Sequence, residues 1–123
     1  MQTMQKNNNC PHRELAYFHV NAAKLACKSY INVCMYCLHA KLAGRLPFML
    51  MLSEFPADIP LSTDPRLDTE RRISAAMLHY PIIITTRGHI VDGRHRIVKA
   101  RRHNYRTIST ITATDEELIS CTC

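Results

Sequence analysis

The sequence predicts an α/β domain of the α+β type, in which a small mixed sheet is flanked by helices and preceded by an N-terminal helical extension. Two observations lead to this prediction: short β-branched runs alternate with segments of helical periodicity, and turns containing glycine separate them. With 123 residues, of which 46% are hydrophobic, the chain can bury one ordinary core. We expect a flexible arm at 1–9, the helical extension at 10–60 packed on the core, and the core itself at 61–123.

The first element expected in the extension is a long helix over Asn21–Ala43. Its polar residues recur at steps of three, four and seven, and the positions between them are apolar, which is typical of a helix buried over most of its circumference. Asn21 is a suitable N-cap, and Gly44 can adopt the left-handed conformation that ends a helix. The apolar run Pro47–Leu52 that follows is compatible with a strand or with a buried loop.

A connection and a second helix come next. Prolines among acidic and hydroxyl residues predict an extended connection over Phe55–Asp68. A helix is then expected from Asp68, as its N-cap, to about His79, with Ile73 and Met77 on its apolar stripe. Pro81 ends it.

The β-branched run Pro81–Thr86 predicts a strand, and Arg87-Gly88 supplies a turn into a second strand at His89–Val91, so that the pair forms a hairpin. After Asp92-Gly93 the periodicity becomes helical, with Ile97, Val98 and Ala100 apolar, until Asn104. A third strand at Thr107–Thr112 and a short helix opening at residues 115–117 complete the pattern.

The net charge of +6 is concentrated in the segment between Arg87 and Arg106, which has seven basic residues and a single acidic one. Clustered cations next to a helix start favour an anionic partner, although a charged solvated face gives the same pattern. We expect nucleic acid as the partner. The side chains expected to contact it are Arg87, Lys99, Arg101, Arg102 and Arg106.

The chemistry is expected where the second strand turns into the helix, at Ile90–Ala100. A helix N-terminus presents unpaired amides and a partial positive charge to an anion, and Gly93 has no Cβ to keep a phosphate away from the backbone. Arg94, His95 and Arg96 add donors at the same point. Asp92 can cap the helix, orient a basic side chain or help to hold Mg²⁺, and the sequence leaves these roles open.

The order strand, D-G-x-H-R, helix and β-branched strand resembles the ParB N-terminal and sulfiredoxin superfamily over about Leu61 to Thr114. The resemblance implies that Gly93, Arg94, His95 and Arg96 bind the phosphates of a nucleotide such as ATP, ADP or CTP with Mg²⁺. The superfamily includes DNA-partition proteins with a CTP switch, nucleases, sulfiredoxins and free-serine kinases. The leading interpretation is a stand-alone ParB-like protein that binds nucleic acid, with nucleotide-dependent or nuclease activity.

Departures from the superfamily narrow the choice. Arg94 stands where sulfiredoxins carry their nucleophilic cysteine, and where partition proteins carry a glutamate, which argues against sulfinic acid repair and places CTP hydrolysis in doubt. The first alternative is a small-molecule kinase that uses ADP or ATP, with Asp64, or failing that Glu70, as base and with Arg96 and His95 as phosphate stabilisers. The residues expected to take part in catalysis are His95, Asp92 and Asp64. The second is a catalytically inactive scaffold that binds another protein through its N-terminal helix.

Cysteine and histidine also cluster in the N-terminal part, at Cys34-x-x-Cys37 with His39 and at Cys10-Pro-His12. These are residue types that zinc prefers, but Cys27, Cys34 and Cys37 fall in the expected helix, so we expect them to pack as core rather than to bind a metal. No apolar run is long enough for a membrane span and no secretory pattern is visible, so a cytoplasmic protein is expected.

Overall fold

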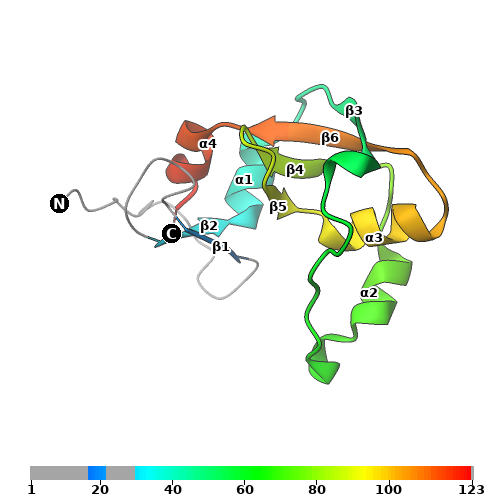
Figure 1. Ribbon diagram of the computed structural model, residues 1–123. Coiled ribbons are helices and arrows are strands. Elements are labelled where there is room, and N and C mark those ends of the chain that lie inside the picture. The colour runs from blue at the N-terminus through cyan, green and yellow to red at the C-terminus, as the bar shows by residue number, and fades with distance from the viewer. Residues whose placement is uncertain (1–16, 22–29, 123) are drawn as a thin grey trace. The chain divides into compact units, whose positions relative to one another are not determined.

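The computed structural model describes residues 17–21 and 30–122. They form an α+β fold with two compact units: Leu46–Thr112 makes one, and the described residues up to Arg45 together with residues 113–122 make the other (Figure 1). The expected arm at 1–9 and the Cys10-Pro-His12 cluster lie outside the described residues. In the described part of the chain, no helix has the length and apolarity needed to cross a bilayer.

The Leu46–Thr112 unit is built on a mixed four-stranded sheet with the order β3-β6-β4-β5. Its strands are β3 (Phe48–Met51), β4 (Ile82–Thr85), β5 (Ile90–Asp92) and β6 (Thr107–Ala113). β3 pairs antiparallel with β6, and β4 pairs antiparallel with β5 with a register shift between Ile83 and Ile84. The predicted hairpin and third strand are therefore confirmed. The ambiguous run Pro47–Leu52 forms a strand over most of its length.

Two helices of this unit lie side by side, α2 (Thr69–Ala75) and α3 (Arg94–Arg102) (Figure 1). Asp68 caps α2 as predicted, since its side chain accepts a hydrogen bond from the Arg71 amide at 3.3 Å. The prediction that this helix continues to about His79 is wrong. It stops at Ala75 because its last carbonyls have a tertiary partner: Lys99 Nζ on α3 donates to the carbonyls of Ser74 and Ala76, each at 2.7 Å.

The early end of α2 also removes Met77 from the expected apolar stripe, and this residue is 52% exposed, whereas Ile73 is buried. The connection before α2 is extended as predicted, apart from a single 3₁₀ turn at Pro65–Leu67. α3 ends at Arg102, and Asn104, the residue predicted to terminate it, follows with a left-handed backbone and a φ of 62°.

The core of this unit lies between α3 and one face of the sheet. Ile97 and Ala100 of α3 are buried, as predicted, and Val98 is half-buried. The cluster in which they pack joins α3, β4, β6 and the segment after β3, and consists of Leu52, Phe55, Ile82, Ile84, Ile97, Ala100 and Ile108. The N-terminus of α3 is thereby held against the start of β4.

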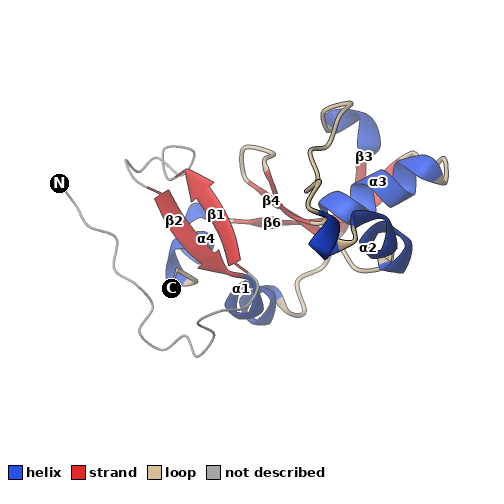
Figure 2. Ribbon diagram, turned by 90° about the horizontal axis from the view of Figure 1, so that it is seen from below, coloured by secondary structure: helices blue, strands red, loops and turns tan. Residues whose placement is uncertain are grey.

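The other unit contains an antiparallel strand pair, β1 (Tyr17–Asn21) and β2 (Tyr30–Cys34), with α1 (Met35–Leu42) and α4 (Asp115–Ser120) against β2 (Figure 2). The prediction of one helix over Asn21–Ala43 is wrong for Tyr30–Cys34, which is a strand, and for Asn21, which ends β1 and is not an N-cap. Residues 22–29 lie outside the described part. A short apolar run does not distinguish strand from buried helix, and pairing with β1 decided the outcome.

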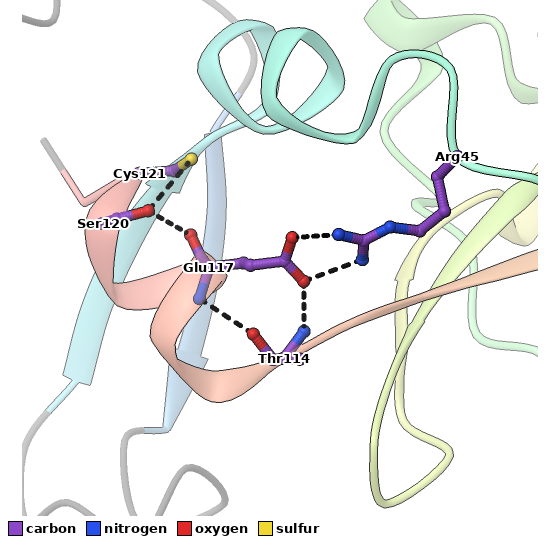
Figure 3. Close-up of polar contacts among 5 residues, drawn as sticks. All are labelled: Arg45, Thr114, Glu117, Ser120 and Cys121. Atoms are coloured by element: carbon purple, nitrogen blue, oxygen red, sulfur yellow. Dashed lines mark hydrogen bonds and ion pairs between the residues drawn. The ribbon is translucent and has the colours of Figure 1, made fainter.

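Near the junction with Leu46, the predicted role of Gly44 is confirmed: its φ is 82°, just beyond the end of α1. The terminal helix α4 begins at Asp115, as predicted, after a capping box in which the Thr114 hydroxyl accepts from the Glu117 amide and the Glu117 carboxylate accepts from the Thr114 amide. Arg45 forms a two-point ion pair with the same carboxylate, so Glu117 joins the two ends of this unit (Figure 3).

Candidate phosphate-binding site

A cavity of about 340 Å³ opens between α2 and the start of α3 in the Leu46–Thr112 unit. This volume falls at the lower end of the range of about 300–1,000 Å³ found for small-molecule sites. α2 and the segment after it, the end of β5 and the first turn of α3 all contribute to its wall. The lining residues are Arg72, Ala75, Ala76, Met77, Tyr80, Asp92, Gly93, His95 and Arg96.

The predicted Asp92, Gly93, His95 and Arg96 therefore meet around one cavity. Gly93 is the N-cap of α3, and the first intrahelical hydrogen bond runs from the Ile97 amide to the Gly93 carbonyl at 3.0 Å. The amides before Ile97 belong to the first turn, where the helix supplies no acceptor of its own. The positive end of the helix dipole is at the same place.

Gly93 is required by the packing of the fold as well. Its φ is 113°, and a Cβ built on it would lie 2.4 Å from Cγ2 of Ile82 and 2.7 Å from Cβ of Ile82. Carbon atoms that are not bonded prefer a separation of about 3.5–4.0 Å. The missing side chain therefore allows the start of α3 to lie directly on β4. This is a structural reason for the glycine, in addition to the predicted close approach of a phosphate.

Arg96 is held firmly at the cavity wall, with its side chain 18% exposed. Its Nη1 donates to the Pro81 carbonyl at 2.7 Å, and its Nη2 lies 3.6 Å from Oδ2 of Asp92. Of the three roles that the sequence left open for Asp92, this geometry shows the orientation of a basic side chain. The N-cap position of α3 has no side-chain cap.

The environment of His95 favours the neutral form of its imidazole. Its burial lowers its pKa below 6.5, and the nearby positive charges of Arg72, Arg94 and Arg96 act in the same direction, while Asp92 opposes them. A neutral ring can donate one hydrogen bond to a phosphate or accept a proton from a bound water or hydroxyl. An anion bound here would offset the neighbouring guanidinium charges.

Arg72 is a site residue that the sequence did not indicate. It lies in the last turn of α2, lines the cavity and is close enough to influence the charge of His95. Its neighbour Arg71 is absent from the cavity lining. The sequence alone shows two adjacent basic residues on a predicted helix, Arg71 and Arg72. Which of them faces the cavity depends on how α2 packs.

Two predicted residues lie elsewhere. Arg94 starts α3 and is not among the cavity-lining residues. Asp64, the candidate base, also does not line the cavity; it caps the 3₁₀ turn at Pro65–Leu67 and binds Arg66, whose Nη2 is 2.8 Å from Oδ2 of Asp64. The Arg66 contacts lower the pKa of Asp64, so this carboxylate is ionised and already paired.

Much of the basic segment is used in contacts within the unit. Arg101 donates to the carbonyls of four residues of the segment after β3: Leu52, Phe55, Pro56 and Ala57. Lys99 binds the end of α2, as described above, and Arg102 pairs with Glu70, with Nη1 to Oε2 at 2.7 Å. The other two residues predicted to contact nucleic acid, Arg87 and Arg106, lie on the exposed surface.

The described residues contain no group of three or more histidine, cysteine, aspartate and glutamate side chains arranged to hold a metal ion. The cavity itself offers two guanidinium groups, a neutral imidazole and one carboxylate, which suits an anion better than a bare cation. Comparisons of the chain with protein-family models, with curated proteins and with solved structures give no match.

Proposed function

We propose that this protein binds a phosphate-bearing ligand, a nucleotide or the backbone of a nucleic acid, in the cavity at the N-terminus of α3. The observation that carries the proposal is the convergence of Arg72, His95 and Arg96 on one cavity beside the first turn of a nine-residue helix. Guanidinium groups bind phosphate oxygens with charge-assisted hydrogen bonds, and the helix N-terminus adds a favourable field. The D-G-x-H-R resemblance supports the same ligand class.

A nucleotide such as ATP, ADP or CTP, accompanied by Mg²⁺, is the ligand that fits the cavity volume best. Met77 and Tyr80 on the wall supply apolar and aromatic surface of the kind that packs against a base or a sugar. Asp92 is the one carboxylate among the described residues that line the cavity, and it is oriented toward Arg96. A phosphotransferase would need this carboxylate or His95 as its base.

Nucleic acid is the second ligand, favoured by the net charge of +6 and by the exposure of Arg87 and Arg106. Because Lys99, Arg101 and Arg102 already bind partners within the protein, few cations of the segment between Arg87 and Arg106 remain for phosphate contacts. The affinity should therefore fall with salt by a shallow slope, since the slope follows the number of phosphates neutralised. A nuclease activity would place His95 and Asp92 at the reacting phosphate. Nucleic acid as a ligand is compatible with the expected cytoplasmic location.

Calorimetry with ATP, ADP and CTP in the presence of Mg²⁺, and with a short DNA duplex, tests the proposal. Arg72→Ala should weaken binding at least about tenfold, because a hydrogen bond to a charged group contributes about 1.5–3 kcal/mol. Arg71→Ala is the matched control, since it removes the same charge from the neighbouring position of α2 and should leave the affinity within about twofold. Binding that both variants weaken equally, or no binding of any of these ligands, would contradict the site.

A further inference from the structure

Three of the cysteines gather in the unit that contains α1 and α4. Cys34 and Cys121 are buried and Cys37 is half-buried, and all three are thiols outside any disulfide. The Cys34 amide donates to the Cys121 carbonyl at 2.9 Å, which joins β2 to the residue after α4. The Cys37 thiol shares a hydrogen bond with the Cys34 thiol and is close enough to Cys121 to be affected by its charge.

Cys34 and Cys37 occupy the two positions of a C-x-x-C motif at the start of a helix. Cys34 is the last residue of β2 and the N-cap of α1, with an extended backbone (φ −75°, ψ 116°), and Cys37 is in the first turn of α1. Side chains three residues apart at a helix start are neighbours, with about 5–6 Å between Cβ atoms. A disulfide needs a Cβ separation of about 3.5–4.5 Å, so a small adjustment brings the two sulfur atoms into bonding distance.

The two thiols differ in accessibility in the way that a stepwise exchange requires. Cys37 is partly exposed and can be reached by a small molecule, whereas Cys34 has no exposed surface. We propose that Cys34 and Cys37 are a dithiol site that a low-molecular-weight disulfide of the glutathione type oxidises to an intramolecular disulfide. Cys37 attacks first, and Cys34 resolves the intermediate.

The reaction balances in two exchanges. The Cys37 thiolate attacks one sulfur of the small disulfide, a Cys37–S–S–R bond forms, and one thiolate of the small molecule leaves. The Cys34 thiolate then attacks Sγ of Cys37, the Cys34–Cys37 bond forms, and the second small thiolate leaves. The protein loses two protons and two electrons, and the small disulfide is reduced to two thiols.

This site is suited to a slow response rather than to turnover. Burial, and then the hydrogen bond that the Cys37 thiol donates to Cys34, raise the pKa of the Cys37 thiol. Catalytic C-x-x-C motifs have the opposite shift, because the thiolate is the reactive form. In a compartment that keeps thiols reduced, the pair would remain a dithiol and would close when the disulfide pool rises.

The test uses the full-length protein, reduced and then incubated with oxidised glutathione under native conditions, alkylated and digested with trypsin. Cleavage after Lys28 and Lys41 produces a peptide, residues 29–41, that contains Cys34 and Cys37 and no other cysteine. We expect this peptide to lose two hydrogen atoms and to resist alkylation. Cys121→Ala, the matched control, should give the same product. A link between Cys37 and Cys121, or a fully alkylated peptide, would overturn the proposal.

Cys34→Ala separates the two steps, because without the resolving thiol Cys37 should retain a glutathione adduct. The absence of this adduct in the folded variant contradicts the order of attack. Should circular dichroism show that Cys34→Ala does not fold, a time course of iodoacetamide labelling of the reduced wild-type protein gives the same information. Cys37 should be labelled before Cys34, and the reverse order would refute the assignment.

Discussion

Replacing Gly93 by alanine tests whether the N-terminus of α3 is placed by its contact with β4. The new Cβ would lie 2.4 Å from Cγ2 of Ile82, more than 1 Å inside the separation of about 3.5–4.0 Å that carbon atoms prefer. Relief of such overlap by shifts in a packed core costs about 1–3 kcal/mol. The positive φ of 113° adds about 1–2 kcal/mol for a residue with a side chain. We expect Gly93→Ala to lower the free energy of unfolding by about 3 kcal/mol.

Gly88→Ala is the control, because Gly88 has a similar backbone, with φ of 85°, and no neighbouring atom within 4 Å of the position that a Cβ would take. It should lose only the backbone contribution of about 1–2 kcal/mol. Urea unfolding followed by circular dichroism measures both variants, and unchanged m-values would show that the difference is one of stability. If Gly93→Ala is no less stable than Gly88→Ala, the contact with Ile82 does not place the helix, and the structural reason for the glycine is refuted.

Three further predictions follow from the ion pairs and the site. The pKa of Glu117 is lowered from 4.5 to about 2, chiefly by Arg45. The contribution of this carboxylate to stability is therefore complete above pH 4.5 and is lost as the pH falls toward 2. Glu117→Gln should cost about 1 kcal/mol at neutral pH and should flatten this acid dependence in thermal unfolding. The pKa of the His95 imidazole should lie below 6.5 by NMR, and it should rise in Arg72→Ala; an unchanged pKa in the variant would contradict the contact between the two residues. Because the folded state resists protonation of His95, the stability of the protein should fall as the pH drops through 6.5. Arg101→Ala should lower the free energy of unfolding by about 2 kcal/mol, because it removes the side chain that donates to carbonyls of the segment after β3. Arg102→Ala removes only an exposed ion pair and should change the free energy of unfolding little. Equal effects of the two substitutions would refute the structural role of Arg101.

The structural use of the basic residues changes how the charge of this protein is interpreted. From the sequence, the segment between Arg87 and Arg106 looks like a surface for polyanions. In the structure, Arg96, Lys99 and Arg101 donate to main-chain carbonyls at the start of β4, at the end of α2 and in the segment after β3. Long cationic side chains satisfy such carbonyls well because they carry several donors. Of this segment, Arg96 lines the cavity, and Arg87 and Arg106 lie exposed away from it.

The sequence determined the elements whose signals are local. The strands β4, β5 and β6 follow from β-branched runs, and the left-handed positions of Gly44 and Asn104 follow from residue types that tolerate a positive φ. The residues from Asp92 to Arg96 meet at one helix start because they are adjacent in the chain. These features depend on backbone preferences that act over a few residues, and they were predicted correctly.

Tertiary structure alone decided the rest. Tyr30–Cys34 is a strand because β1 pairs with it, although its apolar pattern is equally compatible with a helix. Arg72 reaches the cavity, and Arg101 binds the Pro56 carbonyl 45 residues away, because α2, α3 and the connections pack together. Hydrogen bonds and packing between distant segments carry free energies as large as local propensities, and no local pattern encodes which segments will meet.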